Sequence, residues 1–133
     1  MIETIRAAVE GYRNGADEAP WALLLGLEAD IVPALAELFR GESDPDVRSF
    51  LVRVAWERRE KNSAEFIAEA LSDSWEEVWQ SALDGTVALA SPEILAVLKA
   101  AKLQERPDAV MSRRFQMCVE EAILYVEDLI RAG

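Results

Sequence analysis

Apolar residues recur every three or four positions along most of this chain, and short polar breaks interrupt the pattern at intervals. A period near 3.6 residues is typical of an amphipathic helix, whereas strict alternation would indicate strands. Val and Ile rarely alternate with polar residues here, so no strand is expected. The spacing predicts an all-α fold of about eight helices, over approximately 2–13, 17–27, 29–40, 45–61, 63–71, 75–90, 92–103 and 109–131.

Several breaks carry helix-terminal signals. Asn14-Gly15 tolerates the left-handed conformation that closes a helix, and Gly41 is expected to end another. In Ser43-Asp44-Pro45-Asp46 a side chain can cap the next helix while proline opens its first turn. Ser74 and Glu77 have the spacing of a capping box.

The 133 residues are predicted to form a single domain over 1–133, because no linker or low-complexity segment divides them. Connections this short force consecutive helices to run antiparallel.

An internal similarity joins two of the breaks. Leu38 and Leu71 end helices 33 residues apart, and Val47 and Val78 begin helices 31 residues apart. Periods of this length indicate a repeated helical hairpin, which buries its apolar face only by stacking on a neighbour. An ordinary globular helical bundle with similar turns is the alternative.

The repeated segment resembles a known family. Asp44-Pro45-Asp46-Val47-Arg48, followed by Leu51 and Ala55, resembles the turn and second helix of a HEAT-like repeat. The segment 75–83, followed by Leu89-Ala90-Ser91-Pro92-Glu93, resembles a degenerate second copy, which lacks the proline after Asp73 and has Trp79 where arginine is usual. The resemblance covers roughly residues 29–103. It implies a short right-handed α-solenoid of about three stacked antiparallel hairpins with terminal capping helices, and it says almost nothing about function.

Charge narrows the choice of partners. Twenty-five acidic residues against 14 basic ones give a net charge of −11. Such a surface repels nucleic acid and anionic membranes but attracts a basic protein, although acidity also serves solubility alone. No signal peptide or membrane-spanning run is expected, and the single cysteine forms no internal disulfide, so a cytoplasmic location is the default expectation.

Residues for common chemistries are scarce. With no histidine, one cysteine and no glycine-rich phosphate loop, the chain is not expected to be an enzyme or to hold a metal or cofactor. Cys118 is expected to be a buried small hydrophobic residue. The alternative is a Mg²⁺-dependent all-α nucleotide hydrolase using clustered carboxylates, which would require convergence of Glu57, Glu60, Glu121 and Asp128.

A partner-binding surface is the remaining possibility. The segment 62–98 holds seven acidic residues and no basic one, and 17–46 holds eight against Arg40 alone, so two acidic stretches are expected to form one negative face. Aromatic and methionine side chains among acids are typical of protein interfaces. The predicted site comprises Trp56, Glu76, Trp79, Gln80, Asp84, Met117, Glu121, Leu124 and Asp128. Alternatively, the tryptophans fill the space between neighbouring hairpins.

These features favour a non-catalytic, protein-binding function. The favoured role is an acidic bacterial immunity protein that neutralises a basic toxin, because toxins that attack nucleic acid tend to be basic. A HEAT-like scaffold or regulatory subunit is the alternative within the same class. A monomer is assumed.

Overall fold

The computed structural model describes residues 1–133 and consists of eight α-helices without a strand, which confirms the all-α prediction. The helices are α1 Ile2–Arg13, α2 Glu18–Gly26, α3 Val32–Gly41, α4 Pro45–Arg58, α5 Ser63–Leu71, α6 Glu76–Ala88, α7 Pro92–Ala101 and α8 Ala109–Ala132.

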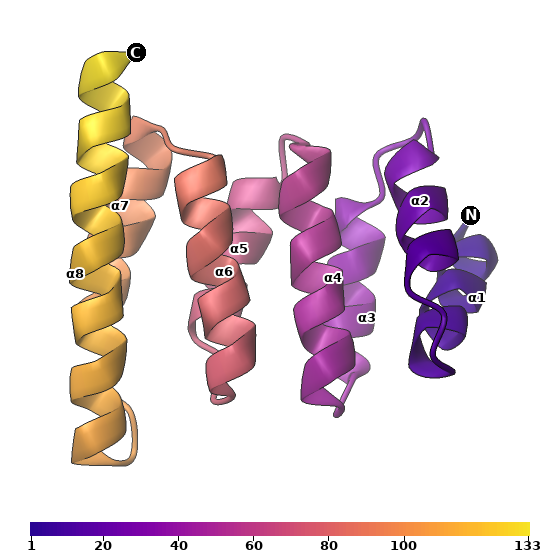
Figure 1. The fold of residues 1–133 in the computed structure, drawn as a ribbon, viewed down its shortest axis with the longest axis horizontal. Helices are drawn as coiled ribbons and strands as arrows, with labels where there is room; N and C mark the ends of the chain where they lie inside the picture. The colour runs from indigo at the N-terminus through magenta and orange to yellow at the C-terminus, as the bar shows by residue number, and fades with distance from the viewer.

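The helices lie in two rows (Figure 1). The nearer row contains α2, α4, α6 and α8 and is called the even row; α1, α3, α5 and α7 lie behind it and are called the odd row. Consecutive helices pack across the rows, except α2 and α3, and helices two apart, such as α4 and α6 or α5 and α7, pack within a row. α8 ends one side of the molecule and extends beyond the other helices (Figure 1).

One apolar core runs between the rows. Thirty buried hydrophobic residues form a single cluster that draws on every helix. Its largest fully buried side chains include Phe50, Trp79 and Phe115, and the Trp79 and Phe115 rings meet edge to face at 5.2 Å between centroids. This T-shaped contact fastens α6 to α8 through the core.

Some terminal signals are confirmed and others are wrong. Gly15 adopts a positive φ of 100°, and the Asp44 carboxylate accepts the Asp46 N–H at the start of α4. The predicted capping box of Ser74 and Glu77 is wrong. Trp75 is the N-cap residue of α6, and its N–H donates to the Asp73 carboxylate.

Two predicted helix ends are also wrong, one through a local backbone conformation and one through a tertiary contact. α4 ends at Arg58 and not near 61, because Arg59 adopts the left-handed conformation at φ 52°. α3 begins at Val32 and not near 29. At this start the Glu60 carboxylate accepts the Ile31 and Val32 N–H groups. Gly41 lies inside α3 as its last residue.

Arginines fasten the connections between helices. Arg58 donates to carbonyls at the end of α2 and pairs with Glu60. Arg48 donates to the Phe39 carbonyl at the end of α3 and pairs with Asp73. Arg106 donates to the carbonyl of the last residue of α5, Leu71, and to the two carbonyls that follow it. Because carbonyls at a helix C-terminus are unsatisfied and carry partial negative charge, a guanidinium there is stabilising. These hydrogen bonds add directional contacts between helices that otherwise pack only through the apolar core.

Candidate functional site

A groove of about 170 Å³ lies between α6 and α8. It is called the α6–α8 groove, and it is lined by Gln80, Leu83, Asp84, Val87, Cys118, Glu121, Ala122 and Tyr125. Residues 80, 84 and 87 repeat at the spacing of one helix face, as do 118, 122 and 125. Two parallel helix faces therefore supply a mixed wall of apolar, acidic and aromatic side chains.

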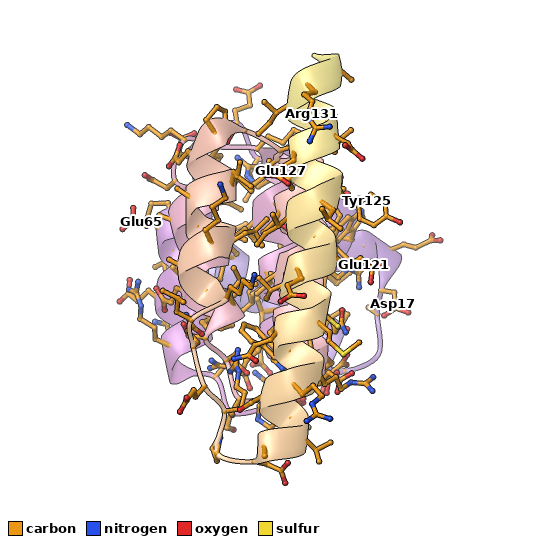
Figure 2. The ribbon with its side chains drawn as sticks, turned by 90° about the vertical axis from the view of Figure 1, so that its left-hand side faces the viewer. Asp17, Glu65, Glu121, Tyr125, Glu127 and Arg131 are labelled. Carbon is orange, nitrogen blue, oxygen red and sulfur yellow. The ribbon has the colours of Figure 1, made fainter.

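Figure 2 shows on which side of the molecule this wall lies. Viewed from the α8 end, Glu121 and Tyr125 point to the side of the even row, where Asp17 also lies, while Glu65 lies on the opposite side (Figure 2). The groove therefore faces solvent on the side where Asp17, the residue before α2, also supplies an acid.

The two carboxylates of the groove lack ion-pair partners. Neither Asp84 nor Glu121 lies within 4.0 Å of a basic nitrogen. By contrast, Glu76 at the start of α6 pairs with Arg114 at 2.7 Å, and Asp128 pairs with Arg131 at 3.0 Å. The groove thus holds two carboxylates that form no ion pair within the chain.

Asp84 is also partly withdrawn from water. Burial raises the pKa of this carboxyl above its usual value, and the charge of nearby Arg53 opposes the shift only in part. A carboxylate that has lost hydration without gaining a partner is disfavoured in its charged form. An incoming cation would relieve this cost.

Cys118 differs from its prediction. The thiol lies at the groove and is half-buried, where the Gln80 amide Nε2 lies 3.6 Å from the sulfur and donates to it. The expectation of a buried cysteine is therefore wrong. The buried face of α8 consists of Phe115, Val119, Ala122 and Val126, and Cys118 lies at its edge.

The structure separates the nine predicted residues. Gln80, Asp84 and Glu121 meet at the groove, and Glu76 lies one turn below Gln80 on α6. Met117 and Leu124, 62% and 64% exposed, and Asp128 do not line the groove, but each lies three, four or seven residues from Glu121 on the same face of α8. The exposed face of α8 therefore continues from the edge of the groove.

The predicted tryptophans do not form an exposed patch. Trp79 has 0% exposure, so its assignment to a partner-binding surface is wrong. Trp56 is half-buried and packs so closely on α6 that a Cβ on Gly85 would lie 2.7 Å from its ring. Both rings fill space between helices, because α4 and α6 each have neighbours on both sides within the even row.

Tyr125 and Arg53 were missed by sequence reasoning. Tyr125 follows Glu121 by four residues, so helical spacing alone was sufficient to include it. Arg53 had no such signal, because its relation to Asp84 depends on how α4 and α6 pack.

No group of three or more potential metal-ligating side chains gathers anywhere in the chain. The four carboxylates of the hydrolase alternative do not converge: Glu60 is nearly buried and binds the start of α3, whereas Glu121 lines the groove on α8. The alternative therefore has no supporting geometry.

Comparisons of this chain with protein-family models, curated proteins and solved structures find no match. The HEAT-like resemblance therefore stays a prediction. None of the eight helices combines the length and apolar character that crossing a bilayer requires.

Proposed function

We propose that this chain binds a basic protein through the outer side of its even row, with the α6–α8 groove as the central contact. The observation that carries the proposal is the pair of exposed, unneutralised carboxylates, Asp84 and Glu121, beside an exposed tyrosine in one groove. A few residues, enriched in tryptophan, tyrosine and arginine, contribute most of the binding energy in protein interfaces.

The proposed architecture is a short α-solenoid of the HEAT-like type. The two rows in Figure 1 support it, as does the packing between helices two positions apart and between all consecutive helices except α2 and α3. Repeated helix pairs of this kind offer broad outer surfaces instead of an enclosed cavity.

The favoured role is that of an immunity protein covering the nucleic-acid-binding surface of a basic toxin. The net charge of −11 supports this role, because opposite charge steers association and speeds encounter. A scaffold or regulatory subunit is the alternative; it would bind a basic partner without inhibiting a toxic activity.

A charge-reversal pair tests the face. Asp84→Lys/Glu121→Lys is compared with Glu37→Lys/Glu65→Lys, which changes the same net charge at exposed carboxylates on odd-row helices α3 and α5. Proteins captured from native lysate by the wild-type chain are identified by mass spectrometry, and the affinity of each purified candidate is measured. We expect the first variant to lose at least about tenfold in affinity, or 1.4 kcal/mol, and the control to lose much less.

Circular dichroism checks that both variants keep the helicity of the wild-type chain. Equal losses in the two variants would assign binding to net charge and overturn the proposed face. Suppression of the partner's toxicity by the wild-type chain would then separate the immunity role from the scaffold role.

A further inference from the structure

A second pocket, of about 380 Å³, lies between α2 and α4 in the even row. It is lined by Tyr12, Asp17, Glu18, Trp21, Phe50 and Arg53, and it is called the Trp21 pocket. Arg53 connects it to the α6–α8 groove, since its guanidinium lies over Trp21 and its charge acts on Asp84.

The floor of the Trp21 pocket is aromatic. Tyr12 stacks on the buried Phe50 with 3.9 Å between ring centroids, and Trp21 is tilted against the same ring at 6.2 Å. The face of an aromatic ring carries negative electrostatic potential, and tryptophan attracts cations most strongly. Such a floor suits a cationic group better than an anionic one.

The chain itself shows a guanidinium over this floor. Arg53 lies 5.1 Å from the Trp21 centroid, compared with 3.8 Å for Arg48 over Phe39 and 3.9 Å for Arg106 over Phe115. The two closer arginines also donate to backbone carbonyls. Arg53 is exposed, forms no ion pair within 4.0 Å and makes no side-chain hydrogen bond, so little holds it in place.

Acidic residues surround the aromatic floor. Asp17 and Glu18 line the pocket with no ion-pair partner, and the Tyr12 hydroxyl donates to Asp46 at 3.0 Å. Burial, together with the hydrogen bond to Asp46 and the charge of Asp17, raises the pKa of Tyr12 to about 12. The pocket therefore combines aromatic faces with net negative potential.

We propose that the Trp21 pocket binds the guanidinium of an arginine side chain supplied by the basic partner. This inference deepens the proposed function and rests on it for the source of the arginine. The incoming group stacks on Trp21, faces Asp17 and Glu18, and displaces Arg53 from the ring. A planar guanidinium fits this arrangement because it stacks on aromatic rings and binds carboxylates through the same group.

The test uses N-acetyl-arginine methylamide as the probe and N-acetyl-citrulline methylamide as its uncharged counterpart. The four tryptophans give four indole N–H signals in a ¹⁵N-labelled sample. We expect the Trp21 signal, assigned with Trp21→Leu, to shift with saturation at millimolar arginine probe. Trp75, which is exposed at the start of α6, serves as the internal control and is expected to stay unchanged.

We expect the Asp17→Asn/Glu18→Gln variant to bind the arginine probe about fivefold more weakly, which corresponds to roughly 1 kcal/mol. Both side chains are exposed, so the variant keeps the fold even if Trp21→Leu does not. Absence of a Trp21 shift, an equal shift with the citrulline probe, or an equal shift of Trp75 would overturn the proposal.

The outcome is separable from that of the proposed function. If the probe binds at Trp21 but Asp84→Lys/Glu121→Lys does not weaken binding of the partner, the proposed face is overturned and the arginine pocket is supported. Partner capture that requires Asp84 and Glu121, without any probe shift at Trp21, would overturn only the arginine pocket.

Discussion

Gly85 is where α4 and α6 approach most closely. A Cβ at this position would lie 2.7 and 2.9 Å from two ring atoms of Trp56 and 3.0 Å from the Ile67 Cδ1. The Trp56 ring is rigid and half-buried, so it has little freedom to move aside. We expect Gly85→Ala to lower the free energy of unfolding by about 1–3 kcal/mol, as overpacking does, despite the better helix propensity of alanine.

Urea denaturation measures this change, and Gly26→Ala is the matched control. Gly26 is also helical, but a Cβ there meets nothing within 4 Å, so only the gain in helix propensity remains. Restored stability in Gly85→Ala/Trp56→Leu would identify Trp56 as the obstacle. A neutral Gly85→Ala would instead mean that Trp56 moves readily, which would return it to the candidate binding residues.

Trp56 also shows what the sequence predicts at the scale of single residues. Helical spacing places Trp56 opposite Val47 and Val54 on α4, which favoured its place in the predicted partner-binding site. The conclusion that it faces solvent is wrong because α6 packs on that side of α4. Residues on terminal α8 were easier to place, since Met117 and Leu124 have no neighbouring helix and are exposed.

At the scale of elements, Glu60 connects the α4–α5 turn to the start of α3. Its carboxylate accepts the Ile31 N–H at 3.1 Å and the Val32 N–H at 3.0 Å, and it pairs with Arg58, both side chains being nearly buried. Burial disfavours its charged form, but these contacts outweigh it and hold the pKa of Glu60 below its usual value. The ionised carboxylate therefore replaces the missing side-chain cap of α3.

We expect Glu60→Gln to lose about 3 kcal/mol of stability near pH 7, because it breaks a nearly buried ion pair and leaves Arg58 uncompensated. A lowered pKa in the folded state means that this stabilisation is present above the unfolded-state pKa of about 4.3 and is lost as pH falls through the folded-state pKa. The difference between wild type and variant should therefore shrink below about pH 4. Denaturation curves across pH measure it.

The control is Asp128→Asn, which removes an exposed pair with Arg131 and is expected to change stability by less than about 0.5 kcal/mol. A wild-type-to-Glu60→Gln difference that stays constant down to pH 3 would show that the charge of Glu60 does not act on α3.

Helix existence was predictable and helix ends were less so. All eight segments were found because each carries a 3.6-residue apolar pattern and local turn residues. The start of α3 was misplaced because Glu60 satisfies the N–H groups there, and the capping box of α6 was wrong because Asp73, close by in sequence, accepts the Trp75 N–H. Sequence spacing does not reveal a cap supplied from 28 residues away.

At the scale of the whole molecule, charge was predictable and its arrangement only partly so. The acidic segments 17–46 and 62–98 do contribute Asp17, Glu18 and Asp84 to pockets of the even row. The segments also contain acids on the odd row, such as Glu65, because a charge run follows the chain through both rows (Figure 2). Which acids share a face depends on the order of the helices in space.

The proposed face makes a kinetic prediction about binding of the captured partner. Electrostatic steering raises association rates by 10- to 1,000-fold and is screened by salt. The Debye length falls from about 10 Å at 0.1 M to about 3 Å at 1 M. We expect the wild-type association rate constant to fall by about tenfold between roughly 0.05 M and 0.5 M salt, while the dissociation rate constant changes much less.

Stopped-flow mixing of the purified pair measures both rate constants. If the field originates on the even row, Asp84→Lys/Glu121→Lys should flatten the dependence of the association rate on salt, and Glu37→Lys/Glu65→Lys should largely preserve it. Both variants carry the same net charge, so they differ only in where the charge lies. Identical salt slopes would mean that the partner responds to the molecule's total charge of −11 and not to one face.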